Sequence, residues 1–475
     1  MFVGRTKELQ FLNDLYSSEK AEFLTIYGRR RVGKTELITE FCKDKTAVFY
    51  SCSECTDKKQ LSKYSDCIFA FNNQDRKYIR RFEDWEQAFS YIPNLVKDEK
   101  LVFVIDEFPY MVKGDKAIPS ILQNLWDHVL SKTNVMLILS GSSISFMEDE
   151  ILAAKNPLYG RMTGIYKLDP LPFDDAIKFF PDYSNEDKVI TYGILGGIPH
   201  YLKQFDPKLS VEENVKRHIL TKGSVLFNEV EYILHQELRE PAAYNTILEA
   251  VAYGNSRYNE ICERAQISSN NAYAYLKGLM EIGLISHEFP VMTSEKEKTK
   301  RNQGEYKISD NFFRFWYAYA FPYASELNQG ESENIWDLVI KNELHNFVSS
   351  AFEKISTDYL RKLNRNHKLP FVFLVAGRWW GKVTEKENDG TFYTKSEEID
   401  ILATDKNKKN YIIGECKFTN APFDLGQLKK VVQKYPTAEK AYYYLFSLSG
   451  FTDAVKELAE KSKNVYLIDF TELFD

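Results

Sequence analysis

The stretch Gly28–Thr35 (GRRRVGKT) decides the fold of the amino-terminal part of the chain. It has the spacing G-x-x-x-x-G-K-[ST], follows the apolar run Phe23–Tyr27 and precedes a segment with helical periodicity. In a strand–loop–helix context, glycines let successive backbone N–H groups turn toward phosphate oxygens at the amino terminus of a helix. The sequence therefore predicts a site for ATP and its Mg²⁺ ion, lined by Gly28, Arg31, Gly33, Lys34 and Thr35.

Two acids after a second apolar run predict the other half of this site. Leu101–Ile105 is followed directly by Asp106 and Glu107. Adjacent carboxylates at the end of a buried strand are costly unless a cation lies nearby. We expect Asp106 and the Thr35 hydroxyl to hold the Mg²⁺ ion, and Lys34 to reach the β- and γ-phosphate oxygens. Glu107 is expected to orient or deprotonate the attacking water.

Two further polar residues are candidates for sensing the phosphates. Ser140 follows the apolar strand Val135–Leu139, where a polar side chain would sense the γ-phosphate, although the run from Ser140 to Ser143 also fits a simple turn. Arg161 is a candidate arginine finger or phosphate sensor, because a planar guanidinium suits the charge that develops on a transferred phosphate. Both residues are assigned to the nucleotide site as hypotheses.

Composition is typical of a soluble protein with several domains. Its 475 residues correspond to roughly three domains. The formal charge is 62 − 68 = −6, so contact with nucleic acid must rest on local patches, and a membrane is not expected as a partner. The sequence has neither a signal-peptide pattern nor an apolar window of ~18 residues, and its six cysteines are too sparse for a disulfide framework. These features favour a cytoplasmic location.

Hydrophobic periodicity divides the chain into five segments. Short apolar runs alternate with helical patterns up to about residue 170, which is typical of a parallel sheet covered on both faces, so the fold class is predicted to be α/β. Gly-Gly and Pro at 196–199 interrupt an otherwise helical lid. The predicted boundaries are 1–170 for the core, 171–237 for the lid, 238–310 for a winged helix, 311–335 for an aromatic docking helix and 336–475 for a last α/β domain.

Segment 238–310 has three helical patterns followed by a hairpin, the arrangement of a winged helix. Its third helix, Ser268–Gly283, carries Lys277 but also Glu281 and is otherwise rich in Tyr, Ala and Leu, which contact phosphates and bases poorly. The hairpin loop mixes lysine, arginine and glutamate. DNA binding is therefore one hypothesis for this segment, and a spacer or lid between domains is the other.

Asp400, Glu415 and Lys417 form a D…E-x-K pattern on two expected strands, 396–404 and 410–418, which follow an expected strand at about 370–376. A hairpin symmetric about residues 407 and 408 places Asp400 opposite Glu415, on the face that also carries Lys417. Buried facing carboxylates survive only with a cation or a shared proton. We therefore expect Mg²⁺ or Mn²⁺ between them, with Lys417 stabilising charge on a phosphate, which predicts a metal-dependent nuclease site.

Several motifs together resemble the archaeal-type ATPase family of P-loop NTPases, relatives of the STAND and AAA+ ATPases. These motifs are FVGR at 2–5, YGRRRVGKT at 27–35, IDEFP at 105–109 and GGIP at 196–199. The resemblance implies a five-stranded core sheet of order 5-1-4-3-2. It also implies an F-x-G-R element near the adenine and switching driven by ATP.

The last segment resembles the domain of uncharacterised function that accompanies this ATPase family, itself similar to the restriction-endonuclease-like PD-(D/E)xK fold. The motifs are GRWW at 377–380, ID at 399–400, GECKF at 414–418 and SGFT at 449–452. The resemblance implies that Glu353 adds a metal ligand and that Gln427 orients the site. The combined hypothesis is an ATPase whose nucleotide state regulates a nuclease-like domain acting on nucleic acid. The alternative is a non-catalytic ATP-driven switch that binds a protein or DNA partner.

Overall fold

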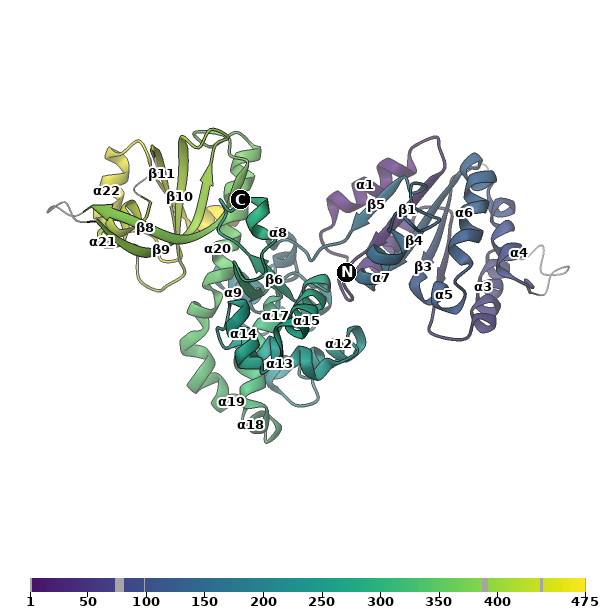
Figure 1. Cartoon of the computed structure of the whole chain (residues 1–475), viewed down its shortest axis with the longest axis horizontal. Coiled ribbons are helices and arrows are strands. Elements are labelled where there is room, and N and C mark those ends of the chain that lie inside the picture. The colour runs from purple at the N-terminus through teal and green to yellow at the C-terminus, as the bar shows by residue number, and fades with distance from the viewer. Residues whose placement is uncertain (1, 73–80, 98, 387–391, 436–438, 475) are drawn as a thin grey trace. The chain divides into compact units, whose positions relative to one another are not determined.

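The computed structural model describes residues 2–72, 81–97, 99–386, 392–435 and 439–474. The chain divides into two compact units, Met1–Ala176 with Ile198–His200 and Ile177–Gly197 with Tyr201–Asp475. Each unit has a five-stranded sheet of its own (Figure 1). Within the described ranges, every helix is too short or too polar to cross a bilayer.

The first unit is built on a parallel sheet of order β2-β3-β4-β1-β5, which is 5-1-4-3-2 when read from the other edge. Strands β1, β3 and β4 are buried along their whole length, because their residues are apolar on both faces. The strands are β1 (Glu22–Tyr27), β2 (Ala47–Ser51), β3 (Leu101–Asp106), β4 (Val135–Gly141) and β5 (Gly164–Lys167). The parallel α/β core expected from the sequence is confirmed.

Helices cover both faces of this sheet (Figure 1). On one face α1 buries Leu12 and α2 buries Phe41. On the other, Tyr64 of α3 contacts the rings of Trp85 and Phe89 from α4 and of Phe103 from β3. The helices are α1 (Thr6–Tyr16), α2 (Lys34–Cys42), α3 (Asp57–Phe71), α4 (Trp85–Ser90), α5 (Phe108–Gly114), α6 (Ile118–His128), α7 (Ile144–Phe146) and α8 (Phe173–Ala176).

A helical region follows, and it is broken at the glycine–proline motif. Helix α9 ends at Leu195, Gly196 has a φ of 64° and α10 begins at Pro199. Glycine adopts the left-handed conformation at low cost and proline is tolerated in a first helical turn, so both residues suit this break. The helices are α9 (Asn185–Leu195), α10 (Pro199–Leu202), α11 (Val211–Val215) and α12 (Glu229–Glu237).

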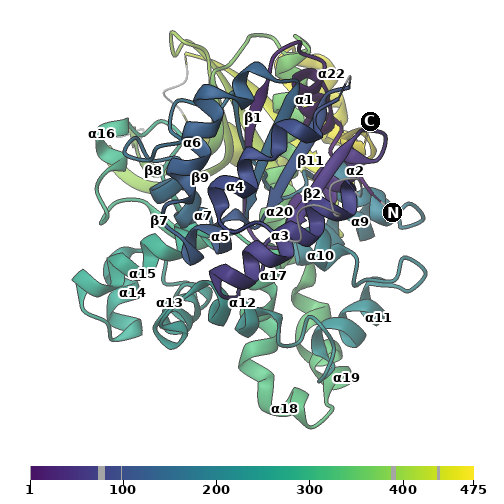
Figure 2. The ribbon, with the colours of Figure 1, turned by 90° about the vertical axis from the view of Figure 1, so that its right-hand side faces the viewer.

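Three helices and a hairpin come next. Helices α13, α14 and α15 lie beside one another in both views, and the antiparallel pair β6–β7 follows them (Figures 1 and 2). The short helix α16 lies in the loop between the two strands. The bounds are α13 (Pro241–Ala252), α14 (Tyr258–Ala265), α15 (Ser269–Glu281), β6 (Ile285–Glu288), α16 (Glu295–Lys298) and β7 (Glu305–Ile308).

The aromatic segment 311–335 is helical without a break from Asn311 to Asn328, although the helix type changes along it, and a further helix begins at Ser332. Trp316 Nε1 donates to the carbonyl of Phe227 at 3.0 Å, and the Tyr317 hydroxyl donates to Asn245 Oδ1 at 2.6 Å. These bonds join the segment to the helical region before it, within the second unit. The helices are α17 (Asn311–Phe315), α18 (Ala324–Asn328) and α19 (Ser332–Ile335).

The carboxy-terminal sheet has the order β12-β11-β10-β9-β8. The pairs β8–β9 and β9–β10 are antiparallel, and β10–β11 and β11–β12 are parallel. Helix α20 packs on one face, where Phe352 contacts Phe418, and the residues of α21 and α22 join the core on the other. The bounds are α20 (Lys341–Arg365), β8 (Val375–Lys386), β9 (Phe392–Thr404), β10 (Asn410–Lys417), α21 (Leu425–Gln433), β11 (Lys440–Ser447), α22 (Asp453–Lys461) and β12 (Val465–Asp469).

The strand expected at about 370–376 is misplaced. It begins only at Val375 and continues to Lys386, through Gly377 and Gly381. Apolar runs predict strands that are buried on both faces, whereas β8 is an edge strand. The backbone of β8 is held by pairing with β9, so its residues need not be apolar. The predicted strand ended too early because it was defined by the apolar run alone.

Candidate functional site

The phosphate loop lies between β1 and α2. Lys34 Nζ donates to the carbonyl oxygens of Gly28, at 2.8 Å, and of the residue after it, at 3.0 Å. A Cβ on Gly28 would lie 2.4 Å from the carbonyl oxygen of Leu168, so only glycine fits there. Arg31 (φ 68°) and Gly33 (φ 98°) turn the loop through the left-handed region, and α2 starts at the next residue after Gly33. The loop is therefore shaped to bind phosphate at a helix amino terminus.

Thr35 and Asp106 meet beside this loop. Thr35 Oγ1 donates to Asp106 Oδ2 at 2.9 Å. Asp106 is 2% exposed, and its Oδ1 is buried without a hydrogen-bond partner among the described residues. A buried carboxylate oxygen without a donor is costly, and hydroxyl and carboxylate oxygens are the ligands that Mg²⁺ prefers. The two residues therefore fit a magnesium ion.

Glu107 contacts a serine that sequence reasoning missed. Its Oε2 accepts hydrogen bonds from the backbone N–H of Ser142, at 3.3 Å, and from the Ser142 hydroxyl, at 2.8 Å. Ser140 lies inside β4, is fully buried, and its hydroxyl has no partner in the described part of the chain. Strand β4 continues to Gly141, two residues beyond its apolar run, so the serine next to Glu107 comes later than expected.

Two distant motifs also contact the phosphate loop. Arg5, which is 3% exposed, donates from Nη2 to the carbonyl of Val32 at 2.9 Å and pairs with Glu8 at 2.9 Å. The Pro199 side chain lies 3.7 Å from the position that a Cβ on Gly33 would take. Arg5 of the F-x-G-R motif and Pro199 of the GGIP motif therefore both lie beside the phosphate loop.

Arg161 lies away from the phosphates of its own chain, which corrects the sequence-based assignment. Its guanidinium pairs with Asp127, at 3.1 Å between Nη2 and Oδ2. Arg161 precedes β5, whose first residue, Gly164, is level with Leu24 at the amino end of β1. The phosphate loop follows the carboxyl end of β1, so Arg161 is at the opposite edge of the sheet. A sensor of the nucleotide on the same chain cannot come from this position.

The second group of candidate residues lies on β9 and β10. Their ladder has the expected register, with Thr404 opposite Tyr411, and it ends at the pair Ile401–Gly414. Between β8 and β9 the register shifts, because three steps along β9, from Ile399 to Leu402, match only two along β8. This extra residue is a β-bulge, which re-aims side chains. Asp400 lies in this bulge, one residue beyond the last pair of the β9–β10 ladder, so its position directly opposite Glu415 stays a prediction.

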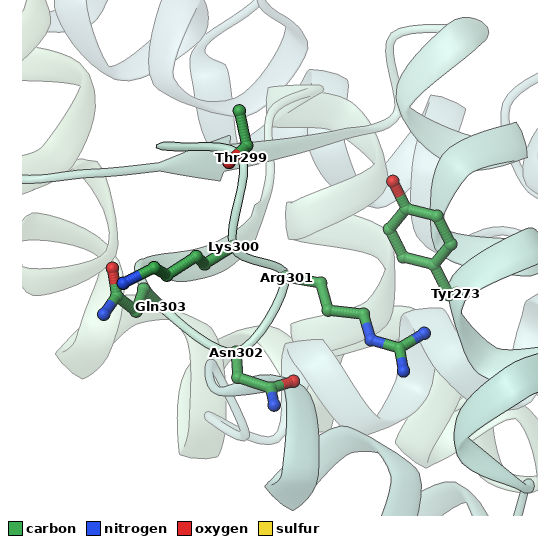
Figure 3. Close-up of a pocket in the computed structure, with 6 residues that line it drawn as sticks. All are labelled: Tyr273, Thr299, Lys300, Arg301, Asn302 and Gln303. Atoms are coloured by element: carbon green, nitrogen blue, oxygen red, sulfur yellow. The ribbon is translucent and has the colours of Figure 1, made fainter. Parts of the chain in front are cut away.

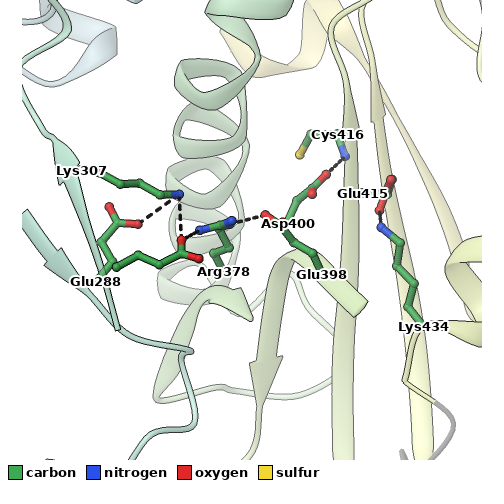
Figure 4. Close-up of polar contacts among 9 residues, drawn as sticks. Glu288, Lys307, Arg378, Glu398, Asp400, Glu415, Cys416 and Lys434 are labelled. Atoms are coloured by element: carbon green, nitrogen blue, oxygen red, sulfur yellow. Dashed lines mark hydrogen bonds and ion pairs between the residues drawn. The ribbon is translucent and has the colours of Figure 1, made fainter. Parts of the chain in front are cut away.

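The two acids of this group make different contacts. Asp400 Oδ2 accepts a hydrogen bond from the backbone N–H of Cys416 at 2.8 Å. Glu415 pairs with Lys417 at 2.8 Å. It also pairs with Lys434 at 2.5 Å (Figure 4). Burial lowers the pKa of Lys417, but its contact with Glu415 outweighs this and the pKa is raised overall. Lys434, at the end of α21, was missed because its sequence gives no sign of which strand it faces.

Asp400 and Glu353 of α20 form an electrostatic pair. Burial, followed by the charge of Glu415, raises the pKa of Asp400 to about 6. Burial, followed by the charge of Asp400, raises the pKa of Glu353 to about 7. In the described ranges, however, the structure has no three His, Cys, Asp or Glu side chains arranged to hold a metal ion. Glu353 thus lies within electrostatic reach of Asp400, whereas a metal centre is not preformed.

Gln427 has a different role from the one that the resemblance implied. Its backbone N–H donates to Asp424 Oδ1 at 2.8 Å, and its Oε1 accepts from the backbone N–H of Asp424 at 2.9 Å. This reciprocal pair is a capping box that satisfies the first backbone groups of α21. The Gln427 side chain is therefore engaged at the helix start.

An ion-pair network connects the β6–β7 hairpin to β8 beside the acids (Figure 4). Arg378 of β8 pairs with Glu305 of β7 at 2.8 Å and with Glu398 of β9. Lys307 lies 3.6 Å from Glu288 and 3.7 Å from Glu305. Both Arg378 and Lys307 lower the pKa of Glu353, against the larger effects of burial and Asp400. The hairpin therefore contributes to the field at the acidic pair.

Comparison with known proteins places these sites in a family. A family described as an ATPase domain predominantly from Archaea matches residues 2–205, and one described as archaeal and bacterial proteins of unknown function matches residues 316–431. Uncharacterized protein MJECL04 of Methanocaldococcus jannaschii is 36% identical over 419 residues, which cover 88% of each chain. The chain belongs to the archaeal-type P-loop ATPase family. The resemblance to that family, expected over residues 1–235, is confirmed for residues 2–205.

Two further proteins are similar to parts of this archaeal-type ATPase. Uncharacterized ATP-binding protein MJ0423 of the same organism is 51% identical over 45 residues, which are 10% of this chain and 76% of that protein. A solved Walker-type ATPase of Pyrococcus abyssi has a TM-score of 0.50 and 20% identity and covers 66% of this chain and 96% of its own. At that identity the similarity shows the fold alone.

Ser142 of the archaeal-type ATPase is expected to set the turnover rate. Ser142→Ala removes one of the two hydrogen bonds that orient Glu107, so we expect kcat to fall about threefold to tenfold while ATP affinity stays within about twofold. Steady-state ATP hydrolysis and nucleotide titration measure the two quantities. Ser143→Ala is the matched control, because no side-chain cap is formed by Ser143 at the start of α7. A kcat unchanged by Ser142→Ala would contradict this role.

Asp400 is expected to destabilise the fold when it ionises. Its pKa is raised to about 6, so the folded chain binds this proton more tightly than the unfolded chain, and the free energy of unfolding falls as pH rises from about 4 to above about 6. Asp400→Asn abolishes this loss and retains an acceptor for Cys416.

The gain in the free energy of unfolding is measured by urea denaturation of the full chain in the presence of EDTA. At about pH 8 we expect Asp400→Asn to exceed the wild type by about 1–3 kcal/mol, with no gain at about pH 4. Asp469→Asn, at an exposed carboxylate of β12, is the control. Equal gains for Asp400→Asn at both pH values would show that the charge is not the cause.

Proposed function

We propose that this archaeal-type ATPase hydrolyses ATP at the phosphate loop and that its nucleotide state controls the second unit. The observation that carries this proposal is the contact of Thr35 with the buried Asp106, 2.9 Å long, beside the loop. These two residues would hold Mg²⁺, which neutralises charge on the phosphates. Lys34 would exchange the loop carbonyls that it now binds for phosphate oxygens.

The remaining residues of the site have two roles: some act on the attacking water and others hold the phosphate loop. Glu107 takes the proton of the attacking water, and Ser142 orients its carboxylate. Arg5 fixes the loop through Val32, and Pro199 packs on Gly33. Pro199 is connected by the chain to Gly196 and α9, which belong to the second unit. Movement of the phosphate loop on nucleotide exchange would therefore be passed through Pro199 to α9.

Two variants are expected to affect ATP binding and ATP hydrolysis separately. Lys34→Ala loses the cation that pairs with the phosphates, so ATP affinity is expected to fall at least about tenfold. Glu107→Gln keeps the volume of the side chain but cannot accept the proton, so kcat is expected to fall about 100-fold or more with ATP affinity preserved. Fluorescent-nucleotide titration and phosphate release measure these effects. Turnover that survives in Glu107→Gln would contradict the assignment of the base.

A second proposal concerns the carboxy-terminal domain and nucleic acid. We propose a winged helix from α13–α15 with β6–β7, and metal-dependent phosphodiester hydrolysis by Asp400, Glu415 and Lys417, with Glu353 as an added ligand. The raised pKa values of Asp400 and Glu353, both half-buried, support this proposal, because a divalent cation relieves their repulsion. The competing function is a non-catalytic switch, supported by the neutralisation of Glu415 by two lysines.

Cleavage assays separate the nuclease from the switch. The wild type is incubated with single- and double-stranded DNA and RNA in Mg²⁺ or Mn²⁺, with and without ATP. The nuclease requires cleavage that Asp400→Asn lowers by about 100-fold and that Asp469→Asn leaves unchanged. Intact substrates in every metal, with normal ATP turnover, would establish the non-catalytic switch.

A further inference from the structure

An open cavity lies between α15 and the loop that joins β6 to β7. Its volume is about 530 Å³, and Tyr273 of α15 and residues 299–303 of the loop line it. Tyr273 is 39% exposed. Figure 3 shows Arg301 extending from the loop toward the Tyr273 side, whereas Lys300 extends to the other side. The cavity is thus bordered by one aromatic ring, two cations and the amides of Asn302 and Gln303.

The two cations are available to a ligand. Arg301 lies over the rings of Tyr258 and Tyr273, at 5.4 and 5.7 Å from their centroids, which holds its guanidinium beside the cavity. Among the described residues, no carboxylate forms an ion pair with Lys300 or Arg301. Hydrogen bonds from Ser294 and, after them, the charge of Lys300 lower the pKa of Glu297, but within the described ranges neither cation is neutralised by an ion pair.

The acids of the same loop are engaged elsewhere. Glu295 pairs with Lys298 at 2.6 Å, and Glu297 accepts from the backbone N–H and hydroxyl of Ser294 in a capping box. The acidic and basic residues of the loop therefore have different roles. The acids stabilise the local structure of the loop, whereas Lys300 and Arg301 line the cavity. A reading of composition alone cannot show this difference.

The neighbouring face of α15 is polar and exposed. Asn270 and Asn271 lie exposed in its first turn, before Tyr273. Asparagine amides match the hydrogen-bonding edge of adenine in the major groove, and lysine and arginine match phosphates. Glu305, in the hairpin pair next to the loop, is held by Arg378. Residues 294–303 of the loop are exposed.

We propose that this cavity is a docking site for duplex DNA, in which Lys300 and Arg301 each contact a backbone phosphate and α15 faces the bases. The proposal rests on the proposed action on nucleic acid, but not on cleavage or on ATP turnover. The chemistry that selects the ligand is a pair of neighbouring phosphates presented by a rigid double helix. An acidic peptide offers negative charge without that spacing.

The test measures binding of the full-length protein to labelled duplex DNA by fluorescence anisotropy at about 50 mM and about 200 mM salt. The variants are Lys300→Ala, Arg301→Met and the double variant. Lys461→Ala, on α22 and 79% exposed at its side chain, is the matched control. Arg301→Met removes the guanidinium that lies over the tyrosine rings but keeps an unbranched side chain at that position, and Lys300 is exposed.

The double variant is expected to bind DNA at least about 10-fold more weakly than the wild type, and its log–log salt slope is expected to be smaller by about two, one unit for each lost phosphate contact. The control should match the wild type. ATP turnover should be unchanged in all variants, so a failure of this proposal is distinguishable from a failure of the ATPase.

Three results would overturn the proposal. One is a double variant with the wild-type affinity and salt slope. A second is a wild type that does not bind the duplex at low salt although it hydrolyses ATP. The third is displacement of the duplex by polyglutamate at equal charge concentration, which would indicate a site for an acidic protein.

Discussion

The hydrogen bond between Thr35 and Asp106 joins two strands that are not neighbours. Thr35 lies at the start of α2 after β1, Asp106 ends β3, and β4 lies between these strands in the sheet. Glu107 then reaches Ser142, beyond the end of β4. The carboxyl ends of three parallel strands are thereby held in one polar cluster. This arrangement depends on the burial of β1, β3 and β4, because apolar faces on both sides force the polar residues to the strand ends.

The sequence predicted this cluster well because its chemistry is local. Lys34 and Thr35 follow the loop directly, and Asp106 and Glu107 follow an apolar strand directly, so spacing alone places them. The apolar run Val135–Leu139 pointed to Ser140, whereas Ser142 contacts Glu107, because the end of an apolar run does not fix the end of a strand. Arg161 does not fit a sensor of the nucleotide on its own chain for a different reason: a residue just before a parallel strand lies at the amino edge of the sheet, away from the phosphate loop.

The carboxy-terminal site shows where pattern reasoning ends. Counting residues from the turn gave the register of β9 and β10 correctly as far as Gly414. The bulge in β9 arises from its pairing with the other neighbouring strand, β8, and the sequence of neither β8 nor β9 predicts it. Lys434 comes from a helix that packs later in the chain, so its contact with Glu415 depends on tertiary structure. Local patterns therefore predicted the strands, whereas long-range packing decided what their acids contact.

The contact of the hairpin with β8 also affects how the domain behaves in isolation. Strand β8 is at the edge of its sheet, and the backbone N–H of Val291 donates to the carbonyl of Arg378 at 3.0 Å. Val291 and Met292 pack against the core of the same sheet. An uncovered edge strand offers its backbone to other chains and promotes aggregation. The segment after β6 thus protects this edge, and a fragment that begins after the hairpin would leave it open to self-association.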